Sequence, residues 1–384
     1  MFRYSILLVI LALAFGAYAK PPRVFIADGS ELQRRREARD PGPELKAWLD
    51  EVKRNADKAL KWAPAFVTSK DGVPPSGDKH DYMSQAPYYW ADPKKPNGLP
   101  YIRRDGERNP EIKKFPDHDL LDKMTSTIEQ LALGYYFTRD ERYASRAREI
   151  LRGWFVEPAT RMNTNLQFAQ AVPGRNDGRG TGILETRALT KVVDGIGLLE
   201  GATSWTDKDQ KAIESWFKDY VDWMITSKNG KDEAAAKNNH GTWYDVQVAS
   251  FALFIGRKDL AKSIVLGAEP RIEKQIEPDG RQPLELERTK SWSYSTMNLD
   301  GLLTLARLAE SVDIDLWNYH SKDGRGIRKA IEFLYPFTTG KKWDYPQIEP
   351  KDDEALYRSM RRAAKKYTDG DYKKMMTTVP ERFS

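Results

Sequence analysis

The sequence of 384 residues contains no cysteine. Without cysteine the chain can form neither a disulfide framework nor a cysteine-linked lipid anchor, so a packed core must stabilise the fold. A chain of this length can bury such a core. Beyond the N-terminus no segment is apolar enough to be a transmembrane helix, and no basic run or known binding motif indicates a nucleic acid partner.

The N-terminus has the layout of a secretory signal peptide. Arg3 is the single cation before an apolar run over residues 6–15, which is too short to span a membrane comfortably. Small residues at Ala17 and Ala19 then precede the expected cleavage point. The sequence therefore predicts cleavage after Ala19, export to the periplasm or out of the cell, and no membrane contact after cleavage. An uncleaved N-terminal anchor is the alternative.

The charge and the aromatic content favour an acidic carbohydrate as the partner. The formal net charge is +6, which suits a polyanionic ligand, although ordinary solvation of a surface rich in both signs explains it equally well. The chain also contains 11 Trp and 18 Tyr. Such flat, amphipathic rings stack on sugars and also fill cores, so they indicate a carbohydrate ligand without requiring one.

Apolar residues recur at helical spacing along most of the chain, and strand patterns are few. Helices are expected over residues 30–62, 120–137, 142–155, 186–200, 207–226, 245–255, 260–266, 295–311 and 325–335. Short turns join the second to the third of these and the sixth to the seventh, so each pair forms an antiparallel hairpin. Repeated hairpins with long polar loops predict an all-α fold, an α/α toroid that forms an incomplete barrel with a site at one mouth.

The domain organisation is expected to be simple. Residues 1–19 are the predicted signal peptide, and no composition break divides residues 20–384, which are predicted to form one catalytic domain. The stretch from Lys70 to Pro116 has many Pro, Gly and aromatic residues and is interpreted as a long ordered loop of functional importance. The C-terminal segment 351–384 is highly charged, and a surface helix is expected over residues 352–367.

Residues 238–244, Asn-Asn-His-Gly-Thr-Trp-Tyr, combine amide donors, an imidazole and two aromatic rings. They precede the helix expected over residues 245–255, and helix N-termini favour anions, so a substrate carboxylate could bind there. The alternative is that Asn238 or Asn239 caps the helix and His240 is structural.

A second cluster spans residues 285–295 and precedes an apolar helix. Arg288 offers a bidentate clamp for a carboxylate. Tyr294 offers a phenol near the helix start, and its proton could be removed if cationic neighbours lower its pKa. The alternative is a helix-leading loop with ordinary ion pairs.

A third cluster lies in the long loop region, where adjacent aromatic side chains follow a glutamine. This arrangement indicates sugar stacking, although the rings could equally anchor the loop to the helices. The segment 173–185 is a weaker candidate for the same cleft. The predicted substrate-binding residues in these two segments are Gln85, Tyr88, Tyr89, Trp90, Arg175 and Arg179.

Three motifs in this order resemble the alginate lyase domain superfamily. They are Ser-Gln-Ala-Pro-Tyr-Tyr-Trp, Asn-Asn-His-Gly-Thr-Trp-Tyr-Asp and Glu-Arg-Thr-x-Ser-x-x-Tyr-Ser, and they lie within about residues 78–335. That superfamily includes polysaccharide lyase families 5 and 38, and the third motif is closer to family 38. The resemblance implies an α/α toroid and a β-elimination that uses no metal and no cofactor. It also implies a site at Asn239, His240, Arg288 and Tyr294.

Elimination from a uronate requires that the carboxylate be neutralised, that the C5 proton be removed, and that the leaving O4 be protonated. We expect Asn239 and Arg288 to neutralise the carboxylate. Tyr294 is expected to be the acid and also the base, with His240 acting as a base or activating Tyr294. The remaining residues expected to bind the sugar are Asn238, Trp243 and Tyr244.

The preferred uronate stays open at this point. In mannuronate and glucuronate H5 and O4 lie on the same face, so one residue can serve as base and acid, whereas guluronate needs two. Family 38 is associated with alginate and with glucuronan. Two other functions are also compatible with the sequence. One is a glycoside hydrolase that uses carboxylates among Asp245, Glu285 and Glu287, and the other is a non-catalytic protein that binds acidic polysaccharide. The mode of attack, endo or exo, and the oligomeric state are left undecided.

Overall fold

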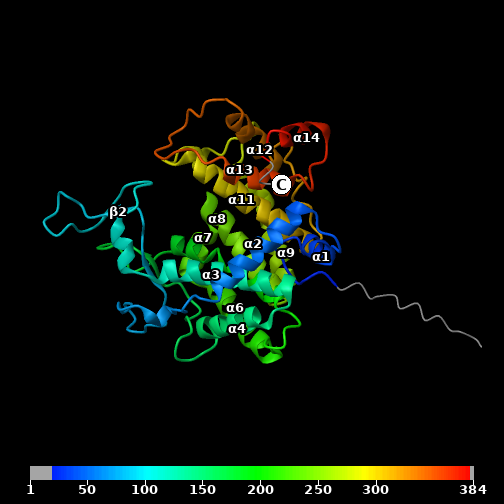
Figure 1. The fold of residues 1–384 in the computed structure, drawn as a ribbon. Coiled ribbons are helices and arrows are strands. Elements are labelled where there is room, and N and C mark those ends of the chain that lie inside the picture. Colours follow the sequence, from blue (N-terminus) through cyan, green and yellow to red (C-terminus); the bar gives the residue numbers. More distant parts are fainter. Residues whose placement is uncertain (1–19, 381–384) are drawn as a thin grey trace, which may run out of the picture.

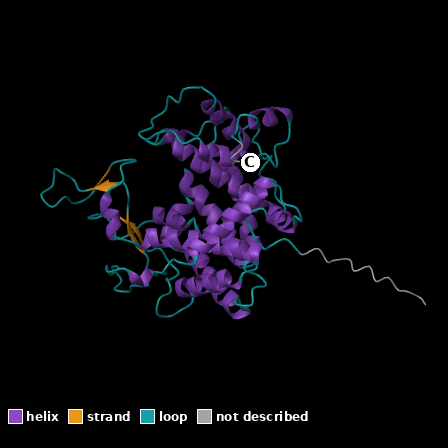
Figure 2. Ribbon diagram, viewed as in Figure 1, coloured by secondary structure: helices purple, strands orange, loops and turns teal. Residues whose placement is uncertain are grey.

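The computed structural model describes residues 20–380, in which helices dominate and strands are short (Figure 1 and Figure 2). The α-helices are α1 (Gly29–Glu37), α2 (Pro43–Ala59), α3 (Asp117–Thr138), α4 (Glu141–Phe155), α5 (Leu189–Leu198), α6 (Asp207–Thr226), α7 (Lys228–Ala234), α8 (Asn239–Phe254), α9 (Lys258–Gln275), α10 (Pro283–Leu286), α11 (Ser291–Ala309), α12 (Ile327–Leu334), α13 (Glu354–Ala363) and α14 (Gly370–Met376). The strands are β1 (Met83–Gln85), β2 (Tyr89–Trp90), β3 (Ile102–Arg103) and β4 (Phe168–Ala171), and η3 (Gly180–Thr186) is a 3-10 helix.

The long helices pack as an inner and an outer row. Helices α3, α5, α8 and α11 follow one another in space, while α2, α4, α6, α9 and α13 pack against them. Helix α8 is the most enclosed, because every side chain from Gly241 to Phe254 is buried. Two of its buried polar residues bond inside the protein: Thr242 donates to Gln275, and Gln247 donates to the Ile183 carbonyl. The two-layered arrangement of helices confirms the predicted all-α fold of the α/α toroid type.

Both predicted hairpins form, and local sequence explains their turns. Between α3 and α4, Arg139 adopts a left-handed conformation with φ of 57°, and Asp140 caps α4 by accepting the backbone N–H of Arg142 at 3.0 Å. Between α8 and α9, Gly256 has φ of 78°, which glycine adopts without strain. The helices therefore turn back on themselves where the sequence indicates.

Several predicted helices have different limits in the structure, and α9, expected over residues 260–266, continues to Gln275. The stretch expected as one helix over residues 30–62 is divided into α1 and α2, because Pro41 and Pro43 surround Gly42 between them. Helix α8 begins at Asn239 rather than at residue 245. The Asn238 side chain caps it by accepting the backbone N–H of His240 at 3.4 Å. The Asn-Asn-His segment is therefore the helix start itself.

The charged C-terminal segment contributes to the core. Helix α13 lies within the predicted surface helix over residues 352–367, but its side chains Leu356, Met360 and Ala363 are buried and the helix packs against α11. The prediction of a surface helix therefore holds for only one face of α13. The other face completes one of the two hydrophobic clusters found among residues 20–380.

The long loop region contains the strands β1, β2 and β3. Strand β1 pairs in parallel with β4, and β2 pairs with β3 in an antiparallel hairpin. In Figure 1 the loop around β2 projects from the helical body, while the rest of this region runs back toward α3. The region is thus anchored at its base by strand pairing with residues 168–171.

One carboxylate fastens the N-terminal segment to the helices. Asp194 of α5 accepts the backbone N–H groups of Phe25 and Ala27, each at 2.7 Å, and that of Ile26 at 3.1 Å. Arg307 of α11 donates to the Ala27 carbonyl at 3.2 Å. Burial raises the pKa of Asp194 to about 7, although the three backbone donors act in the opposite direction.

The predicted signal peptide, residues 1–19, lies outside the described residues. Within residues 20–380 no helix combines the length and the apolar character that crossing a membrane requires.

We expect Asp194→Asn to lower the free energy of unfolding by about 1–3 kcal/mol, because an amide offers one acceptor oxygen to three buried N–H groups. The raised pKa makes this loss depend on pH. The pKa of Asp194 is about 7 in the folded protein and 3.8 in the unfolded chain, so the folded state binds the proton more tightly. The resulting contribution to stability is fully present below pH 3.8 and is lost as the pH rises through about 7.

The difference in free energy of unfolding between wild type and Asp194→Asn should therefore be smaller at about pH 8 than at about pH 5. Urea unfolding at both pH values measures it. A difference that grows with pH would contradict the expectation.

Candidate active site

A cavity of about 560 Å³ opens where the N-terminal ends of α8 and α11 meet the long loop region and η3. All of the sequence clusters contribute to its wall. Tyr88 and Tyr294, for example, are 206 positions apart in the chain and their hydroxyls are hydrogen-bonded. The predicted site residues found in the wall are Gln85, Tyr88, Tyr89, Arg179, Asn238, His240, Arg288 and Tyr294.

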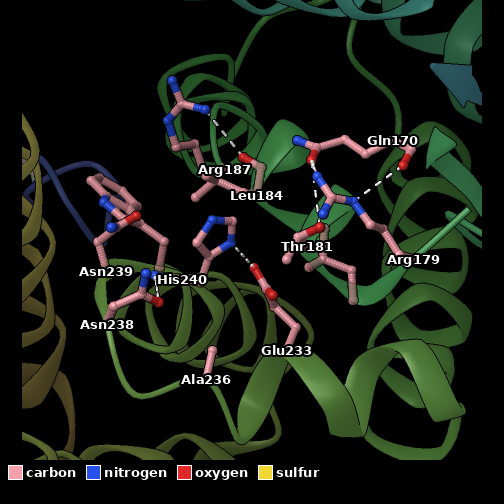
Figure 3. A network of polar contacts seen from close by, with 12 residues as sticks. Gln170, Arg179, Thr181, Leu184, Arg187, Glu233, Ala236, Asn238, Asn239 and His240 are labelled. Atoms are coloured by element: carbon pink, nitrogen blue, oxygen red, sulfur yellow. Dashed lines mark hydrogen bonds and ion pairs between the residues drawn. The ribbon is translucent and has the colours of Figure 1, made fainter. Parts of the chain in front are cut away.

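His240 lies in the first turn of α8, and a buried acid orients its ring. The Nδ1 atom is 2.6 Å from Oε1 of Glu233 on α7, whose side chain is only 1% exposed. A carboxylate accepts hydrogen bonds, so Nδ1 carries a proton, and Nε2 is the nitrogen that faces away from Glu233. Figure 3 shows the ring held from below by Glu233. Nothing in the local sequence identifies Glu233 as this partner.

Asn239 is fully buried and is not part of the cavity wall. Its backbone N–H donates to Oε1 of Glu285 at 2.6 Å, and its Nδ2 donates to Oε2 at 2.8 Å. Burial raises the pKa of Glu285, whose partners in these bonds are neutral groups. The predicted contact of Asn239 with a substrate carboxylate therefore does not match its place in the structure. The residue instead joins the start of α8 to α10.

Arg288 reaches the cavity wall but already holds a carboxylate. Its Nη2 donates to Oδ1 of Asp105 at 2.8 Å, and its Nε donates to both oxygens of Asp105. Asp105 also accepts the backbone N–H of Thr289 at 3.1 Å. These contacts hold the pKa of Asp105 well below its usual range, although burial opposes them. The clamp predicted for a substrate carboxylate is thus partly occupied by a residue of the long loop region.

The Tyr294 hydroxyl donates to the Tyr88 hydroxyl at 3.0 Å, and the Arg288 guanidinium lies 3.6 Å from the centre of the Tyr294 ring. Burial and the neighbouring Tyr88 raise the pKa of Tyr294 far above its usual value, even though Arg288 lowers it. The expected lowering of this pKa by cations is therefore outweighed by desolvation. Without a substrate, Tyr294 is a proton donor.

Arg179 forms another cationic part of the wall. Its Nη2 donates to Oε1 of Gln170 at 2.8 Å, and its Nε donates to the Gln170 carbonyl at 3.2 Å. The guanidinium lies 5.0 Å from the centre of the Tyr89 ring. Figure 3 shows Gln170 and Arg179 to one side of His240 and Arg187 above it.

The wall is strongly cationic, which sequence reasoning only partly anticipated. Its cations are Arg103, Arg108, Lys113, Arg179, Arg187 and Arg288, and its carboxylates are Asp119 and Glu185. Glu185 accepts hydrogen bonds from Tyr82 and Ser84. Most of the cations stand singly in irregular segments, so no spacing pattern revealed them. Their place in the long loop region and beside η3 was the only available signal.

The two aromatic residues that follow His240 lie in the core rather than on the cavity. Trp243 donates its indole N–H to the Met297 carbonyl at 3.1 Å, and the Tyr244 hydroxyl donates to the Met224 carbonyl at 3.1 Å. Both are buried and neither lines the cavity. The prediction that they contact sugar is therefore wrong for this cavity, because α8 is buried from Gly241 onward.

Two further predicted binding residues also lie outside the wall. Trp90 donates to the Glu107 carbonyl and lies under Arg104. Arg175 is exposed, donates to the Tyr101 carbonyl at 2.9 Å and lines a neighbouring pocket of about 450 Å³. The aromatic triplet is therefore divided, with Tyr88 and Tyr89 in the cavity and Trp90 outside it.

The carboxylates considered for a hydrolase are also absent from the wall. Asp245 forms an ion pair with Arg271 at 2.7 Å, Glu285 binds Asn239, and Glu287 is exposed. None of the three is in a position to flank a bond in this cavity. The geometry therefore disfavours hydrolysis by these carboxylates.

Comparisons with known proteins agree on one family. The family described as Alginate lyase matches residues 66–343. The chain is similar to an alginate lyase from Bacteroides ovatus, with 39% identity and a TM-score of 0.89 over 94% of this chain and 96% of that chain. No curated protein matched.

Two more distant structures share the fold. Alginate lyase A1-III from Sphingomonas species A1 has 17% identity and a TM-score of 0.53, over 86% of this chain and 90% of that chain. A variant of alginate lyase A1-III with His replaced by Ala, complexed with a tetrasaccharide, has 16% identity and a TM-score of 0.61, over 94% and 92%.

We expect Glu285→Ala to lower the free energy of unfolding by about 1–3 kcal/mol, because it leaves two buried N–H groups of Asn239 without an acceptor. Glu287→Ala in the same segment is the matched control. Since Glu287 is exposed, its removal should change the free energy by less than about 0.5 kcal/mol. Chemical denaturation of both variants measures the difference, and equal effects would show that Glu285 does not hold the start of α8.

Proposed function

Because the chain belongs to the alginate lyase family and is a polysaccharide lyase, we propose that it cleaves a 1,4-linked uronate polymer, either alginate rich in mannuronate or glucuronan. The observation that carries this proposal is the convergence of His240 and Tyr294 on one cationic cavity. A polyuronate carries one carboxylate per sugar, and a wall with six cations and two carboxylates favours such a chain.

The reaction that we propose is β-elimination without a metal. A base takes the proton from C5, and the electron pair of that C–H bond forms the C4=C5 double bond. The C4–O4 bond then breaks, and an acid returns a proton to O4. One product ends in a 4,5-unsaturated uronate and the other carries a new hydroxyl, so atoms balance without water.

Tyr294 is the proposed proton carrier. Its hydroxyl keeps its proton in the free enzyme, and it is hydrogen-bonded to Tyr88 in the wall. Arg288, stacked on its ring, stabilises the phenolate that forms when that proton leaves. For mannuronate or glucuronate, where H5 and O4 share one face, the same oxygen can remove the first proton and deliver the second.

His240 is the proposed partner of Tyr294. Glu233 fixes its ring through Nδ1, which leaves Nε2 free to accept a proton from Tyr294 or from the substrate. Neutralisation of the substrate carboxylate is assigned to the cavity donors, Arg288 among them. Its Nη1 has no hydrogen-bond partner among residues 20–380. Asn239 contributes by holding His240 in place.

We expect Tyr294→Phe and His240→Ala each to reduce cleavage by about 10²–10⁴-fold, because each removes a group that carries or activates the proton. Purified enzyme is incubated with polymannuronate, polyguluronate and glucuronan. Ultraviolet absorbance of the conjugated double bond and product length are followed together. Wild type should act fastest on polymannuronate or glucuronan.

Tyr319→Phe is the matched control, since its hydroxyl donates to Glu273 outside the cavity. It should retain the wild-type rate. Undiminished cleavage of all three polymers by both site variants would show that the assignment is wrong. Shortening of the polymer without ultraviolet absorbance would indicate hydrolysis instead.

We also propose that residues 1–19 direct export and are removed. The support is the short apolar run behind Arg3 and the small residues at Ala17 and Ala19. Expression of the full chain in a bacterial host, followed by fractionation and intact mass measurement, should give a periplasmic or secreted product that begins at Lys20. A membrane-bound product that retains Met1 would establish an uncleaved anchor.

A further inference from the structure

Arg179 carries a charge that no carboxylate in residues 20–380 balances at ion-pair distance. It is half-buried in the cavity wall, and its side-chain hydrogen bonds go to the neutral oxygens of Gln170. Burial lowers the pKa of Arg179, although Tyr89 and the more distant Glu233 act in the opposite direction. Such a group is unfavourable until an anion binds to it.

The residue that holds Arg179 is itself strained. Gln170 has φ of 53°, a left-handed conformation that residues with a Cβ rarely adopt. Its N–H donates to Ser84 Oγ at 2.8 Å, and that Oγ donates to Glu185 at 2.7 Å, so buried contacts keep the conformation. As a result, the carbonyl and the side-chain oxygen of Gln170 both accept hydrogen bonds from Arg179 (Figure 3). This backbone conformation of Gln170 therefore sets the direction of the Arg179 guanidinium through the two hydrogen bonds.

The cavity contains two pairs of a guanidinium and an aromatic ring. Arg288 lies over Tyr294, and Arg179 lies over Tyr89. Tyr88 connects them, since it precedes Tyr89 in the chain and its hydroxyl accepts the hydrogen bond of the Tyr294 hydroxyl. A pyranuronate presents an apolar ring face and a carboxylate, which an aromatic ring and a guanidinium bind respectively.

The two pairs differ in charge. Arg288 is balanced by Asp105, whereas Arg179 has no such partner. The pair at Tyr294 holds the proposed proton carrier, so the second pair is available for another sugar of the same chain. Two such pairs in one cavity offer contacts for two uronates of one chain.

We propose that Arg179 and Tyr89 form a subsite for the uronate next to the one that is cleaved, with Arg179 receiving its carboxylate. This inference rests on the proposed function. It makes the enzyme select polymers with consecutive uronates over polymers in which uronates alternate with uncharged sugars. Gln170 is the positioning residue of this subsite.

The first test measures binding, so it does not depend on turnover. In a Tyr294→Phe background, calorimetry is used to determine the Kd of a mannuronate hexamer. Adding Arg179→Gln should raise this Kd about tenfold or more, because the carboxylate loses its charged partner. Adding Gln170→Gly, which suits the backbone conformation but removes Oε1, should raise it by a smaller factor and serves if the arginine variant fails to fold.

Arg104→Gln is the matched control, since Arg104 also covers an aromatic ring in the loop region but does not line the cavity. It should leave the Kd unchanged. An Arg179→Gln effect no larger than that of Arg104→Gln overturns the subsite, as does the absence of hexamer binding in every background.

The second test locates the carboxylate and uses wild-type Tyr294. On polymannuronate, Arg179→Gln should raise KM about tenfold and change kcat by less than about threefold, because a neighbouring sugar contributes to binding rather than to chemistry. Partial reduction of the polymer carboxyls should raise the KM of wild type more than that of the variant. A fall in kcat at unchanged KM would place Arg179 at the cleaved sugar and overturn the proposal. If wild type releases no unsaturated product, the proposed function fails while the binding test still decides on the subsite.

Discussion

The first turn of helix α8 is the constraint on which both the fold and the site depend. The helix lies between the two hydrophobic clusters, with Tyr244 in one and Trp243 in the other. Its start cannot move without disturbing both. Glu285 then ties this turn to α10, three residues before Arg288. Buried contacts therefore set the position of His240 relative to the α11 segment, which exposed loops could not do as reproducibly.

The charge of the cavity follows from how its acids are used. Glu233 is engaged by His240, Asp105 by Arg288, and Glu285 by Asn239. Each of these carboxylates holds a residue beside the cavity, and none of the three lines the cavity. The wall itself carries six cations and two carboxylates, so the site favours a polyanion over a neutral sugar.

The state of Tyr294 illustrates the competition between burial and charge. A guanidinium stacked on the ring favours the phenolate, but loss of water and the adjacent Tyr88 hydroxyl favour the phenol more strongly. The free enzyme therefore holds the proton at this oxygen. A substrate carboxylate and further loss of water would both favour the phenol as well, so the proposed phenolate depends on Arg288 and on a base such as His240.

Local patterns in the sequence were sufficient for the helical hairpins, because helix periodicity and turn residues act over a few positions. The residue types also identified His240 and Arg288 as members of one cavity. Only the tertiary structure decided that Asn239, the neighbour of His240, faces a buried acid rather than the cavity. It also decided that Trp243 belongs to the core. Arg288 forms its ion pair with Asp105, which lies 183 positions before it in the chain. The physical reason is that packing between distant segments decides both outcomes. It sets which side of a buried helix meets a cavity and which acid pairs with a given cation.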